Sequence, residues 1–355
     1  MSFQILAINP GSTSTKAALY TDEHPTLELT LRHTAEQIGS FPTIIDQLDW
    51  RRDMILKALA DKDFDIKNLS AVIGRGGLVK PIESGVYSVN ESLKHDLIHA
   101  TMHHASNLGG LIADQIAQRA NVKAYIADPV VVDEMIDEAR VSGLPECPRA
   151  SIFHALNQKA TARLYAKEQG KRYQELNLIV AHLGGGISVS AHRQGRVIDT
   201  NNALNGDGPF APERAGSLPA CSLVDLCFSG RYTQVELQKM LSGKGGLVAL
   251  LGSNSVMDIV GQVDKGDTKA KQILDAMCYN VAKAIGGMAA VLDGQVDAII
   301  LTGGIAYNAY ITNYIQKKCQ FIAPVSIYPG ENELQSLANN ALMVLRNEVT
   351  PKEYK

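Results

Sequence analysis

Short apolar runs recur twice along the chain around a turn of small residues. Residues 3–8 form an apolar run, residues 9–15 are rich in Gly, Ser and Thr, and residues 16–20 return with apolar side chains. Residues 178–183 form a second run, which three glycines separate from an alternating run at 187–192. Each pattern predicts a strand, a tight turn and a returning strand. Two copies about one domain length apart indicate an internal duplication.

The remaining hydrophobic pattern predicts further strands and helices in mixed order. Strands are expected at 27–31, 71–74, 123–126, 195–200, 296–301 and 325–328. Helical spacing of apolar residues is found at 44–59 and 91–102, and a further helix follows the polar turn at 103–107 and ends near residue 120. The same spacing is found at 149–169, 223–228, 234–241, 255–263, 268–292 and 334–346. In the helix at 149–169, Leu164 is assigned to the apolar side. This order predicts an α/β fold in which helices flank mixed sheets.

Length and composition limit the class of protein. A chain of 355 residues exceeds the usual size of one core, so two domains are expected. The net charge of −3 argues against nucleic-acid binding. The sequence contains no run of eighteen apolar residues, so a membrane-spanning helix is not expected. The N-terminus enters a strand without the pattern of a signal peptide, and five cysteines form no C-x-x-C pair. We therefore expect a cytoplasmic protein with reduced thiols.

Glycine-rich turns of this kind allow backbone N–H groups to approach an anion. Three glycines between two strands also occur in ordinary hairpins, so the turn alone does not decide the function. Neither Lys16 nor Lys244 stands in the G-x-x-x-x-G-K-[ST] context of a P-loop, and protein-kinase signatures are absent. A nucleotide site must therefore be built in another way.

Several polar side chains follow predicted strands or lie on constrained loops. Arg75 ends a strand and runs into Gly76 and Gly77, which suits an anion, although a surface arginine beside a turn is equally compatible. Asp128 closes the strand at 123–126, where open α/β sheets place their chemistry. Arg214 lies in a long loop rich in Asn, Gly and Pro. The adjacent histidines His103 and His104 lack a third ligand at metal spacing, so a zinc site is not predicted.

Taken together and in order, four motifs resemble the acetate and butyrate kinases, within the superfamily of acetate and sugar kinases, heat-shock chaperones and actin. They are Asn9-Pro-Gly-Ser-Thr-Ser-Thr-Lys16, His182-Leu-Gly-Gly-Gly-Ile-Ser188, Pro212-Glu-Arg-Ala-Gly216 and Gly303-Gly-Ile305. The resemblance covers essentially the whole chain and is closer to the butyrate kinases. It implies two duplicated ribonuclease-H-like domains with a nucleotide cleft between them. The expected boundaries are 1–150 plus 334–355 for the first domain and 151–333 for the second.

The resemblance also implies roles for individual residues. The first phosphate loop would comprise Asn9, Gly11, Ser12, Thr13, Ser14, Thr15 and Lys16. The second would comprise Gly184, Gly185 and Gly186, and the adenosine loop Gly303, Gly304 and Ile305. The catalytic set would comprise Arg75, Asp128, His182, Arg214 and Glu333, with Glu331 as an alternative to Glu333. Asn9, Asp128 and Glu333 carry hard oxygen atoms that suit Mg²⁺. His104 and Asn107 are candidates for the carboxylate pocket, although Asn107 is equally suited to cap a helix.

The activity implied is phosphorylation of a short-chain carboxylate by ATP, which becomes ADP, with Mg²⁺ as the cofactor. The two anions must be aligned and their repulsion neutralised, which arginines can do. Butyrate or a branched acid is the favoured substrate, acetate or propionate is the alternative, and an actin-like or chaperone ATPase is a third interpretation. We expect a homo-oligomer, a dimer or larger, without nucleic-acid or membrane partners.

Overall fold

A computed structural model describes residues 2–100, 104–204 and 206–355, which divide into two compact units. Unit 1 comprises residues 1–132 and 332–355, and unit 2 comprises residues 133–331. This division falls after Val132, whereas the sequence analysis expected it at residue 150. The reason is that Ile136 N donates to Ile198 O at 3.0 Å, and Glu134 Oε2 accepts from Val197 N at 2.8 Å. These bonds attach the segment after Val132 to unit 2.

Unit 1 contains a seven-stranded mixed sheet with the order β12-β5-β6-β4-β1-β2-β3. Its strands are β1 (Gln4–Pro10), β2 (Ser14–Thr21), β3 (His24–Arg32), β4 (Ala71–Arg75), β5 (Val86–Ser88), β6 (Lys123–Ala127) and β12 (Lys352–Glu353). The first three strands form an antiparallel meander, and β1, β4 and β6 are parallel neighbours. The carboxyl ends of these three strands therefore meet at one edge of the sheet.

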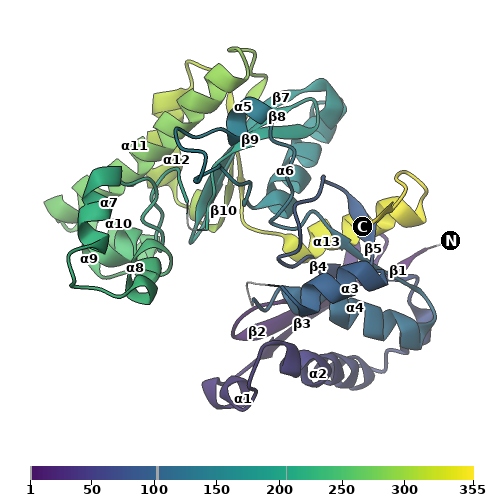
Figure 1. Cartoon of the computed structure of the whole chain (residues 1–355). Coiled ribbons are helices and arrows are strands. Elements are labelled where there is room, and N and C mark those ends of the chain that lie inside the picture. Colours follow the sequence, from purple (N-terminus) through teal and green to yellow (C-terminus); the bar gives the residue numbers. More distant parts are fainter. Residues whose placement is uncertain (1, 101–103, 205) are drawn as a thin grey trace. The chain divides into compact units, whose positions relative to one another are not determined.

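Helices cover both faces of this sheet (Figure 1). The helices of unit 1 are α1 (Ala35–Gly39), α2 (Leu48–Ala60), α3 (Glu91–Ile98), α4 (Asn107–Ala120) and α13 (Glu333–Leu345), of which α1 has no buried residue. Leu6 and Ile8 of β1 share a buried core with α2 and α4. The alternate residues Ile5 and Ala7 are also fully buried, and α13 packs on the same strand. Because side chains alternate along a strand, α13 covers the opposite face.

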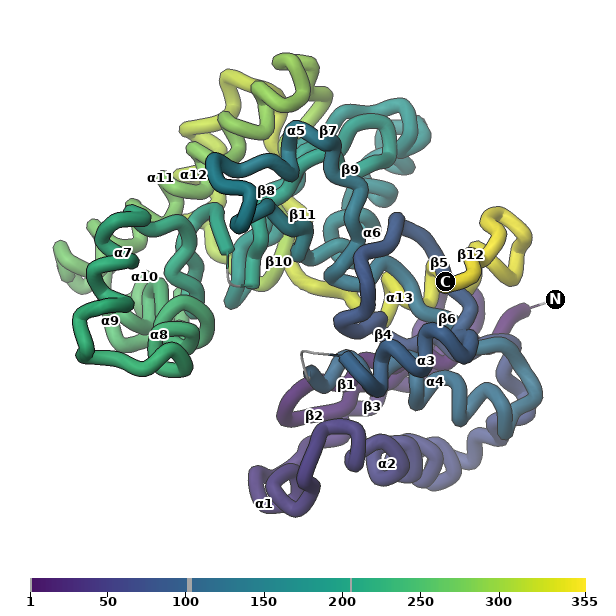
Figure 2. Tube along the Cα trace, in the orientation of Figure 1, coloured from purple at the N-terminus to yellow at the C-terminus, as the bar shows by residue number. Residues whose placement is uncertain are grey.

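Unit 2 is built around a five-stranded mixed sheet with the order β11-β10-β7-β8-β9. Its strands are β7 (Asn177–Leu183), β8 (Ile187–Arg193), β9 (Arg196–Thr200), β10 (Ala298–Gly303) and β11 (Val325–Pro329). The path of the chain repeats that of unit 1, as the tube in Figure 2 allows the reader to trace. The antiparallel meander of β7, β8 and β9 is again followed by two parallel strands, because β10 pairs with β7 and β11 pairs with β10. The predicted duplication of two mixed sheets flanked by helices is confirmed.

The helices of unit 2 are α5 (Asp137–Arg140), α6 (Ala155–Glu168), α7 (Ala220–Cys227), α8 (Gln234–Leu241), α9 (Gly246–Leu251), α10 (Val256–Asp264), α11 (Thr268–Val291) and α12 (Ala309–Cys319). Ile179 and Ala181 of β7 share a core with α11 and α12, whereas Leu178 and Val180 pack against α6. The interpretation of Leu164 was wrong, because its side chain is 46% exposed and its neighbour Tyr165 packs on the sheet instead. None of the helices in the described parts of the chain has both the length and the apolar character needed to cross a membrane.

A glycine pair lets α4 approach β4 closely enough for backbone to touch backbone. A Cβ added at Gly74 would lie 2.0 Å from Gly109 O, and one added at Gly109 would lie 2.3 Å from Arg75 O. Neither neighbour is a flexible side chain, so the helix would have to move away from the sheet. The position of Arg75 at the end of β4 depends on this close approach.

We expect Gly74→Ala to lower the free energy of unfolding of unit 1 by about 3 kcal/mol, because the added methyl group overlaps backbone atoms. Urea unfolding followed by the fluorescence of Trp50, the single tryptophan, which lies in unit 1, measures this loss. Gly39→Ala is the control, since a Cβ there meets no atom within 4 Å and its effect should stay within about 1 kcal/mol. Equal stability of the two variants would contradict the prediction.

Candidate active site

Three candidate residues of unit 1 lie at the ends of neighbouring parallel strands. Asn9 lies near the end of β1, Arg75 is the last residue of β4, and Asp128 follows β6. The pairing of Ile8 with Gly74 and of Arg75 with Ala127 aligns these ends. The sheet therefore gathers a carboxamide, a guanidinium and a carboxylate at one edge, where open α/β folds bind ligands.

Glu333 joins Asn9 and Arg75, although it is far from both in sequence. The Arg75 Nη1 atom lies 2.8 Å from Glu333 Oε1 and 3.4 Å from Asn9 Oδ1. The Asn9 amide donates a short hydrogen bond to the other carboxylate oxygen of Glu333. The first turn of α13 thus contributes its carboxylate to the strand ends of unit 1. Glu331, the alternative, lies in unit 2 beside His182.

Asp128 is buried, and its backbone lies in the left-handed region. Its φ is +40°, and such strain is concentrated at functional sites. Its Oδ1 atom accepts hydrogen bonds from Ser84 Oγ at 2.6 Å and from Gly85 N at 2.9 Å. These bonds fix the direction of the carboxylate.

The first glycine turn lies between β1 and β2, and its residues have different surroundings. Gly11 N donates to Ser14 O at 2.7 Å, which closes the turn. Ser12, Thr13 and Lys16 are exposed. Thr15 is fully buried, and its hydroxyl lies 2.9 Å from His33 Nε2 and 3.0 Å from Arg51 Nη1. Thr15 therefore supports the turn from beneath.

In unit 2, His182 lies at the end of β7 beside the second glycine turn. Thr302 of β10 is its direct parallel neighbour, and a Cβ at Gly184 would lie 3.0 Å from His182 Nε2. Gly303 has a φ of +89° and passes so close to Leu183 that a Cβ would lie 2.4 Å from Leu183 O. The two glycine turns of this unit therefore lie at the same strand edge.

Asn157 of α6 orients the ring of His182. Its Oδ1 atom lies 2.7 Å from His182 Nδ1 and accepts from Thr302 Oγ1 at 3.2 Å, while its amide donates to Gly330 O at 3.4 Å. Since Oδ1 can only accept, His182 carries a proton on Nδ1. Its Nε2 atom therefore faces the glycine turn. Nε2 lies 2.9 Å from Glu331 Oε1, although the alignment is too poor for a hydrogen bond.

A second histidine stacks on this ring. The ring centroids of His154 and His182 are 3.7 Å apart and the planes differ by 10°. His154 Nδ1 lies 2.8 Å from Ser188 Oγ, which also accepts from Gln158 Nε2 at 2.8 Å. Gln158 in turn holds the buried His192 at 3.0 Å. This polar network anchors His182 to α6 and β8, and sequence analysis missed it because no motif marks it.

A cavity of about 550 Å³ adjoins the glycine turns of unit 2. Gly184 and Gly185 form part of its wall, and Gly304 and Ile305 form another part. Cavities of 300–1,000 Å³ are the usual size for small-molecule ligands. The cavity thus brings together the predicted phosphate and adenosine loops. Its further lining residues are Pro212, Glu213, Asn254, Ser255, Val256, Met257, Tyr307, Asn308 and Glu331.

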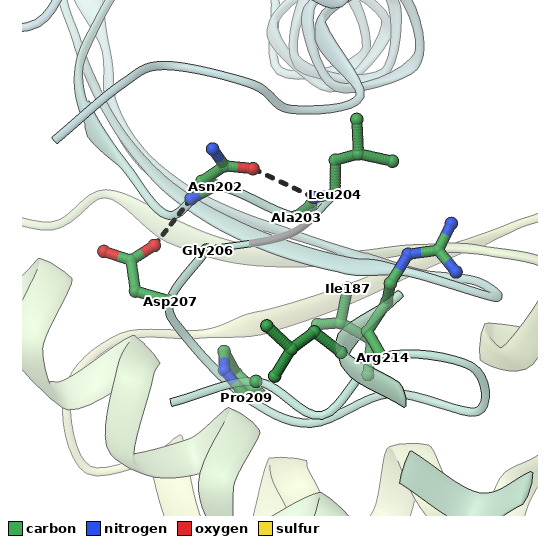
Figure 3. Close-up of a pocket in the computed structure, with 10 residues that line it drawn as sticks. Ile187, Asn202, Ala203, Leu204, Gly206, Asp207, Pro209 and Arg214 are labelled. Atoms are coloured by element: carbon green, nitrogen blue, oxygen red, sulfur yellow. Dashed lines mark hydrogen bonds between the residues drawn. The ribbon is translucent and has the colours of Figure 1, made fainter. Parts of the chain in front are cut away.

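Arg214 extends from a loop that is fixed by backbone hydrogen bonds. Ala211 N donates to Arg214 O at 3.0 Å, and Ala215 N donates to Leu241 O at 3.0 Å. Figure 3 shows the long Arg214 side chain beside a small hollow of about 10 Å³, which has room for about one water molecule. The Nε atom of Arg214 is buried and has no acceptor among the described residues, and the Glu213 carboxylate lies 3.7 Å from Nη1. The guanidinium therefore retains unused hydrogen-bond donors.

The two candidates for the carboxylate pocket have defined contacts, and the neighbouring His103 lies outside the described residues. Asn107 is buried in the first turn of α4, and its Oδ1 accepts from Leu78 N at 2.9 Å. It therefore holds the turn that follows Arg75, and Ser106 occupies the cap position instead. His104 Nδ1 lies 2.8 Å from Ser106 Oγ. Loss of hydration, and then the positive charge of Arg75, lower the pKa of His104.

The profile of the acetokinase family matches residues 149–344 of the chain. Butyrate kinase 2 of Clostridium acetobutylicum is 56% identical over 356 residues, which cover all of both chains. The chain belongs to the acetokinase family. A probable butyrate kinase of Bacteroides thetaiotaomicron is 55% identical over 99% of this chain and all of that protein. The crystal structure of acetate kinase from Porphyromonas gingivalis superposes with a TM-score of 0.78 at 17% identity, over 96% of this chain and 100% of that chain.

The expected Mg²⁺ ion would require oxygen ligands at this site. Within residues 2–100, 104–204 and 206–355, no three or more His, Cys, Asp or Glu side chains are grouped to hold one. Glu333 offers a carboxylate, but the Asn9 amide nitrogen donates to its Oε2 atom and Arg75 Nη1 lies 2.8 Å from its Oε1 atom. Because Mg²⁺ usually keeps waters and takes one or two carboxylates plus substrate phosphates, Glu333 would hold such an ion only once these two groups turn away from it.

We expect acid to destabilise unit 1 through His33, which is buried beneath the first glycine turn. Burial, and then the charge of Arg51, lower its pKa to about 4. In the unfolded chain the pKa is about 6.5, so the unfolded state binds more protons between these values. The stabilisation is complete above pH 6.5 or so and is lost as the pH falls toward 4.

Between pH 7 and pH 5 the wild type should lose about 2 kcal/mol more unfolding free energy than His33→Gln. Urea unfolding at both values, again followed by Trp50, measures the difference. His24→Gln serves as the control because His24 is exposed. Parallel losses in the wild type and His33→Gln would show that His33 does not carry this effect.

Proposed function

We propose that this member of the acetokinase family transfers the terminal phosphoryl group of ATP to butyrate or a branched short-chain carboxylate, reversibly. The observation that carries the proposal is the full-length similarity to butyrate kinases at 55–56% identity. The gathered side chains at the strand ends support the same chemistry. The protein would be a phosphotransferase with a carboxyl group as acceptor.

The 550 Å³ cavity of unit 2 is proposed to hold ATP or ADP. Gly303, Gly304 and Ile305 would contact the adenosine, since Gly304 and Ile305 line the cavity. The phosphates would extend toward Gly184, Gly185 and Gly186, where small residues allow backbone N–H groups to approach an anion.

The unit 1 residues are proposed to act on the phosphates, the metal ion and the acceptor. Ser12, Thr13 and Ser14 would contact phosphate, and Lys16 supplies an exposed charge near them. Asn9 and Glu333, with Asp128, would hold Mg²⁺, which screens the charge of the transferring group. Arg75 would orient the acceptor carboxylate, because a guanidinium matches its two oxygens.

The transfer itself requires alignment more than proton movement. A carboxylate oxygen of the acceptor forms a bond to the terminal phosphorus, and the bond from that phosphorus to the bridging oxygen breaks, so ADP leaves with the electron pair. The acceptor is already ionised at neutral pH, so no general base is needed. Arg214, and His182 when it carries a proton on Nε2 as well as on Nδ1, are proposed to donate hydrogen bonds to the equatorial oxygens, where charge spreads in the transition state.

We further propose that the protein acts in the cytoplasm as a homo-oligomer. ATP is the cytoplasmic phosphoryl donor, and all five cysteines are free thiols, which suits a reducing compartment. Exposed apolar side chains on α7 and beside it, Val224 at 54% and Phe228 at 87%, are suited to a contact between copies.

The decisive experiment compares acyl phosphate formation from acetate, propionate, butyrate, isobutyrate and valerate, trapped with hydroxylamine. Butyrate or isobutyrate should exceed acetate in kcat/KM by at least about tenfold, because two methylene groups are worth about 1.6 kcal/mol. Acetate as the best acceptor would replace the proposal with an acetate kinase. ATP hydrolysis without any acyl phosphate would place the protein with the ATPases.

Arg214→Ala should lower kcat by at least about a hundredfold while the affinity for ATP changes little, since the guanidinium meets charge that develops in the transition state. Steady-state kinetics and nucleotide titration measure the two quantities. Arg231→Ala is the matched control, because Arg231 is an exposed residue of the same unit that lies over the ring of Tyr232. Near-normal turnover of Arg214→Ala would remove Arg214 from the mechanism.

A further inference from the structure

Arg51 of α2 lies directly beneath the first glycine turn. The residue is 1% exposed, and its Nη1 atom donates to Gly11 O at 2.9 Å, Thr15 Oγ1 at 3.0 Å and Ser14 O at 3.4 Å. Its Nε and Nη2 atoms donate to Gln47 Oε1 at 3.0 and 2.8 Å. One guanidinium therefore connects both ends of the turn to α2.

All these acceptors are neutral. Among the described residues the hydrogen-bond acceptors of Arg51 include no carboxylate, and the Trp50 ring at 5.9 Å is its aromatic neighbour. By contrast, the buried Lys159 lies 2.6 Å from the carboxylate of Glu134. Burial lowers the pKa of Arg51 to about 10, which leaves it charged at neutral pH. Burying an ion without a counter-ion is costly, so an anion bound from outside the chain would stabilise this positive charge.

The geometry of the turn indicates where that partner binds. The carbonyl oxygens of Gly11 and Ser14 point inward to Arg51. Ser12 and Thr13 are exposed, and their backbone N–H groups have no acceptor among the described residues. The outer side of the turn thus presents free N–H groups, and the buried charge lies behind them. Both features favour an anion at the same place.

We propose that Arg51 is a positioning residue that holds the first glycine turn and, through its buried positive charge, strengthens the grip of the turn on the phosphates of the nucleotide. The inference rests on the proposed function in one respect, namely that a nucleotide is the ligand of this turn. Arg51 touches the turn and not the ligand, so its charge acts through the low-dielectric interior.

The sharpest test neutralises the charge without removing the guanidinium. Gln47→Glu replaces the amide that Arg51 already contacts with a carboxylate of the same shape, which keeps both hydrogen bonds and forms an ion pair. Binding of Mg·ADP, measured by calorimetry, should weaken by about tenfold or more, because the field at the turn is cancelled. The KM for butyrate should change by less than about twofold.

Gln4→Glu is the matched control, since it adds the same charge at the start of β1, about 20 Å of strand away from the turn. Its Mg·ADP affinity should equal that of the wild type. Arg51→Lys keeps the charge and should bind Mg·ADP better than Arg51→Met, which loses it. A purely structural role predicts the opposite pattern, in which the isosteric Gln47→Glu binds normally and Lys and Met at position 51 are equally impaired.

Three outcomes would overturn the inference: unchanged Mg·ADP affinity in Gln47→Glu, no rescue by Lys at position 51, or no Mg·ADP binding by the wild type. If Arg51→Met fails to fold, the Gln47→Glu comparison alone decides. The proposed function fails separately, through absence of acyl phosphate formation by a wild-type protein that binds Mg·ADP.

Discussion

The register between parallel strands is the constraint on which the candidate site depends. Hydrogen bonds that pair Ile8 with Gly74 place Asn9 beside Arg75 at one sheet edge of unit 1. The pairing of Thr302 with His182 places these two residues side by side at one sheet edge of unit 2. Because side chains alternate along a strand, a shift of one residue would turn these groups to the wrong face. The positions of the functional groups therefore depend on the strand register of the two sheets.

Close packing and buried polar bonds then hold the functional groups in place. Gly74 and Gly109 allow α4 to lie against β4, and Gly303 allows β10 to pass beside Leu183. Beneath the turns, unit 1 uses a buried arginine and unit 2 uses Asn157 and a stacked histidine pair. Equivalent turns in the duplicated sheets thus have different supports. Unit 1 adds a permanent positive charge, whereas unit 2 fixes the direction of one imidazole ring.

Much of the framework could be predicted because its signals are local. Alternation around the two glycine turns predicts both hairpins, and the expected strand at 123–126 lies within β6 (Lys123–Ala127). The supports could not be predicted in this way. Arg51 reads as one charged residue in an amphipathic helix, and Asn157 as one polar residue in another. The partners of Arg51 in the turn lie 36 or more positions away, and those of the Asn157 side chain lie 25 or more away, so no spacing rule connects them.

The sequence by itself determined the duplicated α/β architecture and the glycine turns, since these depend on hydrophobic period and local turn chemistry, whereas the roles of the candidate residues came from the family resemblance. Only the tertiary structure decided which of them meet. It placed Glu333 with Asn9 and Arg75, placed Glu331 beside His182, and turned the Thr15 hydroxyl inward to Arg51. The physical reason is that such contacts are set by sheet register and helix packing, which involve residues far apart along the chain.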